Sequence, residues 1–268
     1  GTYEAVGRLL TSPCFVTSQE ERTTLARQVM GHAAEPSTSD QGGHDTCSVG
    51  SIETNLYAKD PEIASSLVAK IGLNGRFRDS EGRYTTLSKE NLRPDREASK
   101  TTPAVGDRDY ASQLFQTTAI NVLYNDEFFP RSYGKVEPVS QKDTGERSFR
   151  FGFESEFTGL SYNQRERIHQ LITGRKDPDL HVPILPKDAS TLDRHLTDLH
   201  SRNKFPSIIS VHTGNAPFNE SPGGRHALNV YGYDPVTKKV ALDNQWGEFQ
   251  DHIIKPIDLE TLFKATYA

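Results

Sequence analysis

The chain has 268 residues, enough for one large domain or for two lobes around a cleft. Its 31 basic and 36 acidic residues give a net charge of −5. A general nucleic-acid binder would show a basic excess, so the charge argues against that class of protein. No apolar run approaches the roughly 18 residues of a membrane-spanning helix, and two cysteines, Cys14 and Cys47, cannot form a disulfide framework. No signal-peptide pattern opens the chain and Gly1 stands in place of Met, so we expect a processed form or a fragment.

Apolar residues at helical spacing dominate the first half of the chain. They predict four helices, over 19–31, from Cys47 to Asp60, over 61–74 and over 109–124. Asp45 or Thr46 is the expected N-cap of the second helix, and Pro61 suits the first turn of the third. Between the third and fourth helices the sequence is polar, and we expect a small hairpin at 77–84 and an exposed linker at 93–105.

Strand-like segments become frequent in the second half. We expect strands over 131–139, 147–153 and 207–211, and helices from Ser161 to Gly174, over 191–202 and after Asp258. Helices first and strands later indicate an α+β fold, with a helical lobe followed by a sheet lobe.

A β-hairpin is predicted within residues 223–247, with turn chemistry at 234–238. His226 opens its first strand and Asn244 ends its second. Because residues near the open end of a hairpin face each other, we expect Asn244 to contact the imidazole of His226. Asp243 is the alternative partner, but side chains alternate along a strand, so only one of these two neighbours can face His226.

Cys47 is the candidate nucleophile. The N-terminus of its predicted helix carries partial positive charge, which favours a thiolate, and a protonated His226 beside it would lower the thiol pKa further. A Cys with a His and an Asn elsewhere in the chain is the arrangement of a thiol nucleophile, its base and the residue that orients the base. His195 and His200 are five residues apart, a poor spacing for a shared metal ion, so we expect no metal and no cofactor.

These segments resemble the motifs of papain-like cysteine peptidases. Members of that superfamily place a Gln six residues before the Cys, the Cys at a helix start, His-Ala before a strand, and then Asn-x-Trp-Gly. The chain has Gln41, Cys47, His226-Ala227 and Asn244-Gln245-Trp246-Gly247 in the same order. The tail Trp246-Gly247-Glu248 is similar to the calpain branch, whereas Ser48 stands where papain and calpain relatives usually have Trp.

The resemblance implies one papain-like catalytic domain over residues 1–268. Its helical lobe, approximately 1–125, would carry Cys47. Its lobe of antiparallel sheet, 126–268, would carry His226 and Asn244, with the active site in the cleft between the lobes.

The same resemblance implies the role of each residue. Cys47 would attack the substrate carbonyl, His226 would move the proton, and Asn244 would orient the imidazole under the cover of Trp246. The Gln41 side chain and the Cys47 backbone N–H would donate to the developing oxyanion.

The leading hypothesis is therefore a cysteine protease that hydrolyses peptide bonds in protein or peptide substrates through an acyl-enzyme thioester. A protein glutamine deamidase or transglutaminase would use the same thiol chemistry, and an inactive papain-fold binding module is the non-enzymatic alternative. The size of the chain and its distant resemblance fit a bacterial effector or toxin domain, delivered into a target cell and held in check by an inhibitor or immunity protein.

Overall fold

The computed structural model describes residues 1–13, 16–100, 106–127, 132–134, 147–151, 153–157, 159–183, 187–245 and 253–267. Within these residues, helices are combined with antiparallel sheets, which confirms the predicted α+β class. In the same part of the chain, none of the helices is long and apolar enough to cross a membrane.

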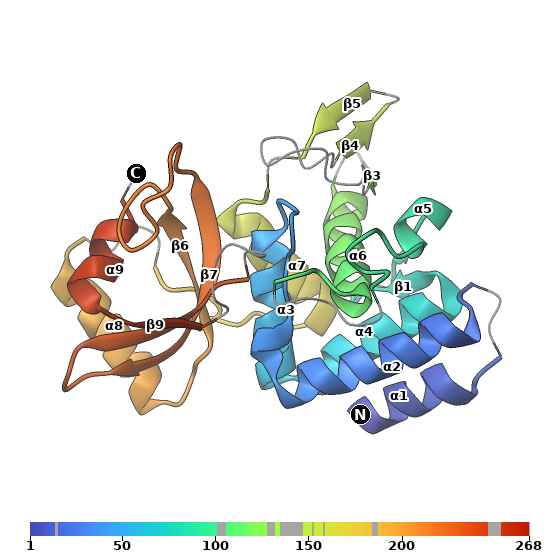
Figure 1. Ribbon diagram of the computed structural model, residues 1–268, viewed down its shortest axis with the longest axis horizontal. Helices are drawn as coiled ribbons and strands as arrows, with labels where there is room; N and C mark the ends of the chain where they lie inside the picture. Colours follow the sequence, from blue (N-terminus) through green and yellow to red (C-terminus); the bar gives the residue numbers. More distant parts are fainter. Residues whose placement is uncertain are drawn as a thin grey trace.

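Most helices gather in the N-terminal part of the molecule, where they pack against one another (Figure 1). Their bounds are α1 Thr2–Thr11, α2 Gln19–Ala34, the 3-10 turn Pro36–Thr38, α3 Cys47–Lys59, α4 Pro61–Asn74, α5 Lys89–Leu92, α6 Tyr110–Asp126 and α7 Tyr162–Thr173. Two more helices, α8 Ala189–Ser201 and α9 Leu259–Ala265, lie beside the sheet of the C-terminal part.

The described strands form three antiparallel sheets. Two are small: β1 (Arg76–Arg78) with β2 (Tyr84–Thr86), and β3 (Ser132–Gly134), β4 (Arg147–Arg150) and β5 (Phe153–Glu156) in that order. The largest has the order β6 (Ser207–His212), β7 (Arg225–Asp234), β8 (Lys239–Asp243) and β9 (Ile253–Asp258). The predicted hairpin is its β7–β8 pair, and in it Asn229 lies opposite Asp243.

The buried apolar side chains fall into two clusters. The first contains side chains from α1, α2, α3, α4, α6 and α7, such as Leu9, Leu25, Ile52, Leu67, Ile120 and Ile168. The second lies between the large sheet and helices α8 and α9, and contains Leu192, Leu196, Leu228, Val230 and Leu262. Helix α7 packs against α6, and the first cluster also includes Leu180 and two residues of the large sheet, Ile208 and Ala227.

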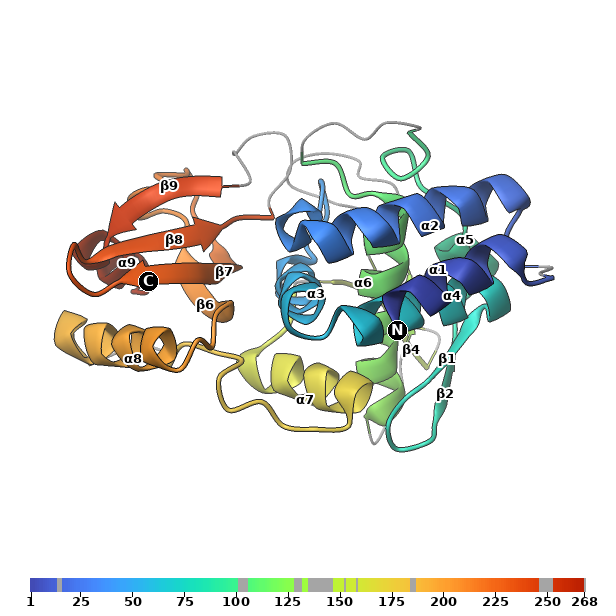
Figure 2. The same cartoon turned by 90° about the horizontal axis from the view of Figure 1, so that it is seen from below.

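Helix α3 lies at the junction of these two parts, with β7 beside it (Figure 2). Polar contacts join the helix to the large sheet. The Asn229 side chain donates to the Ser51 carbonyl at 3.2 Å, and the Asn55 side chain donates to the Pro206 carbonyl at 2.8 Å. These asparagines are fully buried, so the hydrogen bonds satisfy groups that water cannot reach.

Capping chemistry explains several helix boundaries. Ser161 forms a capping box at the start of α7, and Gly174 ends the helix in a left-handed conformation, both at the predicted positions. Asp60 is the N-cap of α4, as expected, although its side chain makes no capping bond and its carboxylate pairs with Arg175 instead.

Some expectations were wrong. Residues 147–153 are not one strand, because the chain turns at Phe151 and continues as β5. The linker expected over 93–105 is not uniformly exposed, since Asp95 and Ala98 are each only 3% exposed. Residues 101–105 and most of the strand expected over 131–139 lie outside the described residues.

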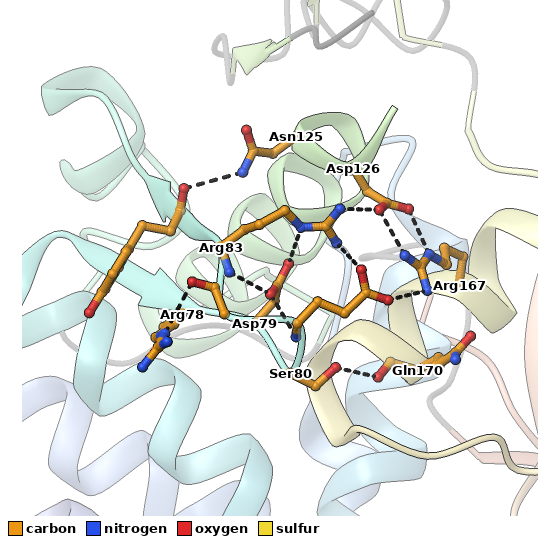
Figure 3. Close-up of polar contacts among 11 residues, drawn as sticks. Arg78, Asp79, Ser80, Arg83, Asn125, Asp126, Arg167 and Gln170 are labelled. Atoms are coloured by element: carbon orange, nitrogen blue, oxygen red, sulfur yellow. Dashed lines mark hydrogen bonds and ion pairs between the residues drawn. The ribbon is translucent and has the colours of Figure 1, made fainter. Parts of the chain in front are cut away.

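A polar network fixes α7 to the β1–β2 hairpin and to the end of α6 (Figure 3). Arg83 from the hairpin and Arg167 from α7 both contact the carboxylate of Asp126. Their hydrogen bonds, chiefly that of Arg167, lower the pKa of Asp126 to about 2. Ser80 also donates to the Gln170 carbonyl at 3.1 Å, so the hairpin contacts the C-terminal half of α7 as well.

Candidate functional site

Cys47 is the first residue of α3, as the sequence predicted. Its N-cap is Thr46, whose hydroxyl donates to Gln116 of α6 at 2.7 Å and makes no capping bond to the helix. The Cys47 side chain is partly exposed and its thiol is free. A partly exposed thiol at the positive end of a helix is in a position that favours the thiolate.

His226 approaches Cys47 from β7. The two side chains are hydrogen-bonded, and the backbone N–H of Ala227 donates to the same sulfur. His226 is only 4% exposed. The structure therefore brings together the Cys and the His that lie 179 residues apart in the sequence.

Asn244 follows the last residue of β8 and contacts His226 from the other side. Its Oδ1 lies 2.7 Å from Nε2 of the imidazole, which leaves Nδ1 as the ring nitrogen for the thiol. Asp243 is turned away and accepts a bond from Gln245 at 2.6 Å. The predicted choice of Asn244 over Asp243 as the neighbour of His226 is confirmed, whereas Trp246 lies outside the described residues.

The charges of the site favour an ion pair between Cys47 and His226. Burial alone would raise the pKa of the thiol, but the hydrogen bond and charge of His226 outweigh it and leave the pKa below its ordinary value. Burial alone would lower the pKa of His226, but the thiolate and Asn244 outweigh it and raise the pKa. Each group therefore stabilises the charged form of the other.

Gln41 lies in the loop before α3, with its side chain buried. Its amide nitrogen donates to the His44 carbonyl at 2.6 Å, and its backbone N–H donates to the Gln245 carbonyl at 3.0 Å. A carboxamide has two N–H donors, so the His44 carbonyl occupies one and the second stays available. The loop is thereby tied to the segment that carries Asn244.

The conformation of this loop depends on buried charges. Gly42 has φ +61°, and a Cβ there would clash with the Glu97 carboxylate. In the same region Asp95 lies 2.9 Å from Arg108 and 3.4 Å from the His44 ring, with all three side chains essentially inaccessible to water. Asp95, in the segment expected to be an exposed linker, therefore helps to hold the loop before Cys47.

A second buried network lies behind α3. Gln116 contacts Glu53 at 3.0 Å, and Ser112 contacts the same carboxylate at 3.0 Å. Burial raises the pKa of Glu53 to about 7. His32 lies 3.1 Å from Asp109, and despite burial, which lowers it, the pKa of His32 is raised to about 9 by the charge and hydrogen bond of Asp109.

Sequence reasoning missed Arg165 on α7. Its guanidinium donates to the Ser210 hydroxyl at 2.8 Å, and its charge contributes to the low pKa of Cys47 after burial and the contributions of His226 and Ala227. Arg165 precedes Ile168 by three residues and Ile172 by seven, which places it on the buried face of the helix. A cation on an apolar helix face was the signal that could have identified it.

The geometry thus unites Cys47, His226 and Asn244, with Gln41 in the adjoining loop and Arg165 on the neighbouring helix. The chain matches no protein-family model, no curated protein and no solved structure.

Proposed function

We propose that the chain is a papain-like cysteine peptidase, with two lobes and an active-site cleft between them. The observation that carries the proposal is the hydrogen-bonded series from Cys47 through His226 to Asn244. It supplies a nucleophile at a helix N-terminus, a base, and an amide that orients the base, which are the parts of thiol acyl transfer.

In the proposed reaction the Cys47 thiolate attacks the carbonyl carbon of a peptide bond. The protonated His226 then gives its proton to the leaving amine as the C–N bond breaks, and a thioester with Cys47 remains. Water, deprotonated by the now neutral His226, hydrolyses the thioester and restores the thiol. Asn244 keeps the imidazole in the orientation that both proton transfers need.

The negative oxygen of the tetrahedral intermediate requires donors that are in place before attack. The backbone N–H of Cys47 and the second N–H of the Gln41 amide are the proposed pair. The hydrogen bond of Gln41 to the His44 carbonyl would hold the amide at a fixed angle, so that no reorganisation accompanies the reaction.

The test is a screen of denatured proteins and peptide libraries with the wild-type chain and Cys47→Ala. Cleavage by the wild type alone, with a thioester trapped at Cys47, is the expected result. Release of ammonia from glutamine side chains without chain scission would instead identify a deamidase or transglutaminase. A Cys47 that reacts with iodoacetamide no faster than an ordinary thiol would favour the inactive binding module.

A further inference from the structure

Arg165 is a buried cation without a carboxylate partner among the described residues. It is only 4% exposed; Nη2 donates to Ser210, and Nε has no hydrogen-bond partner. The other deeply buried arginine of the site, Arg108, lies 2.9 Å from the Asp95 carboxylate. A buried charge costs several kcal/mol unless an opposite charge compensates it, so the difference between the two arginines requires an explanation.

His181 adds a second buried donor next to Arg165. It is 4% exposed, and neither of its ring nitrogens has a hydrogen-bond partner. Its ring packs against Tyr162, with centroids 4.2 Å apart. Burial first, and then the charges of Arg165 and other cations, lower the pKa of His181 to about 3, so at neutral pH its ring is neutral and offers one N–H.

The thiolate of Cys47 does not use these donors. It is paired with His226 and with the Ala227 N–H, and Arg165 acts on it only through space. The Nε of Arg165 therefore remains available for another acceptor.

Several residues around these donors are partly exposed. Ser210, Leu160, Tyr162 and Cys47 are all partly exposed. Ser210 lies opposite Ala227 in the β6–β7 ladder, and Ala227 donates to the Cys47 sulfur. The buried guanidinium, held by the Ser210 hydroxyl, is thus close enough to Cys47 for the two charges to interact.

We propose that Arg165, together with His181 and Ser210, forms a subsite beside Cys47 that binds a carboxylate of the substrate. This inference rests on the proposed function, and it specifies the substrate class: proteins or peptides with an Asp or Glu close to the reacting carbonyl. A carboxylate matches the planar fork of a guanidinium and accepts hydrogen bonds from both buried donors.

The first test compares two reagents that alkylate Cys47, the anionic iodoacetate and the neutral iodoacetamide, followed by mass spectrometry of the Cys47 peptide from the full chain. We expect Arg165→Met to lower the ratio of the iodoacetate to the iodoacetamide rate constant about tenfold, because a charge-assisted contact is lost. Arg167→Met is the matched control, since Arg167 lies on the same helix but contacts Asp126, and it should leave the ratio unchanged. If Arg165→Met slows both reagents equally, Arg165 acts on the thiolate alone and the subsite does not exist.

The second test needs no variant and so does not depend on the folding of Arg165→Met. The amide-capped derivatives of glutamate and glutamine differ only in the carboxylate. We expect the glutamate derivative to slow the reaction of wild-type Cys47 with iodoacetamide and the glutamine derivative to have little effect. Equal protection by the two compounds would overturn the proposal.

Neither test uses peptide cleavage, so the two proposals can fail separately. If the ratio of the iodoacetate to the iodoacetamide rate constant depends on Arg165 but the chain cleaves no substrate, the subsite is supported and the peptidase is rejected. If the chain cleaves substrates without a preference for acidic residues near the cut bond, and Arg165→Met does not change the ratio, the peptidase is supported and the subsite is rejected.

Discussion

Oδ1 of Asn244 lies 2.7 Å from Nε2 of His226, and both side chains are almost completely shielded from water. The contact fixes one ring nitrogen of the imidazole and directs the other toward Cys47. It joins the ends of two neighbouring strands, so the orientation of the imidazole is set by the pairing of β7 and β8.

The first prediction concerns the ion pair of Cys47 and His226. An ordinary thiol with a pKa of about 8.5 is almost entirely protonated at pH 6 and reacts slowly. Since the pKa of Cys47 is lowered, the wild type should react with iodoacetamide at pH 6 faster than an ordinary thiol does. In His226→Ala the loss of the cation should move the pH–rate profile to higher pH, and turnover should fall at least about 10²-fold.

In Asn244→Ala turnover should fall less, roughly tenfold, because this side chain orients the base and does not transfer the proton. An equal loss of turnover in a folded Asn244→Ala variant would contradict that role.

Gln41→Ala should separate turnover from thiol reactivity. Loss of one oxyanion donor costs roughly 2.7–4 kcal/mol in the transition state, or about 10²–10³-fold in kcat. Alkylation of Cys47 by iodoacetamide develops no oxyanion and should change little. Both rates are measured on the same preparation, and circular dichroism shows whether the loop before α3 is intact. Normal turnover in Gln41→Ala would assign the oxyanion donor to another group.

The network behind α3 contributes more to stability in mild acid than in mild alkali. The pKa of Glu53 is raised to about 7 and that of His32 to about 9, so between pH 5 and 9 these two groups bind more protons in the folded than in the unfolded state. Their contribution to stability must then fall as the pH rises through this range. His32→Gln should flatten the upper part of the profile, above about pH 6.5, where the wild type loses on the order of 3 kcal/mol. Denaturant titrations of the wild type and His32→Gln at a series of pH values measure both slopes, and a difference in stability between them that does not change from pH 7 to pH 9 would refute the assignment.

Asp95 provides a test of the buried charges that hold the loop before Cys47. Asp95→Ala would remove the buried carboxylate that Arg108 and His44 contact, and we expect a loss of about 3–5 kcal/mol in the free energy of unfolding. The matched control is Asp60→Ala, which breaks the more exposed pair with Arg175 and should cost less than about 1 kcal/mol. Comparable losses in the two variants, measured by urea unfolding, would show that burial of the Asp95 pair has no special effect.

Local patterns predicted the parts of the site that depend on neighbouring residues. The start of α3 at Cys47 follows from the rules of helix ends. The contact of His226 with Asn244 follows from hairpin pairing, although it is diagonal, since the register places Asn229 opposite Asp243. Strand β9 was missed because it contains Pro256, which argues against a strand unless the strand lies at the edge of a sheet, as β9 does.

Long-range pairs were beyond such rules. Asp95 resembles any charged residue of a polar linker, and its burial follows only from the position of Arg108 on another segment. Arg165 is similar, since its place on an apolar helix face shows that it is buried but not that its neighbour is Cys47. The sequence shows which residues are charged, but not which of them lie close together in the fold.

The interface between α3 and the large sheet has one further consequence. Its buried hydrogen bonds, from Asn229 to the Ser51 carbonyl and from Asn55 to the Pro206 carbonyl, can form in only one alignment of the helix. A slip of one residue moves α3 by about 1.5 Å along its axis and breaks both, and each buried group left unpaired costs about 1–3 kcal/mol. A purely apolar interface would tolerate intermediate positions of the helix. This interface favours either complete docking of α3 or its separation from the sheet. Loss of the contact between Cys47 and His226 should therefore accompany separation of α3 from the large sheet, and not a small displacement along the helix axis.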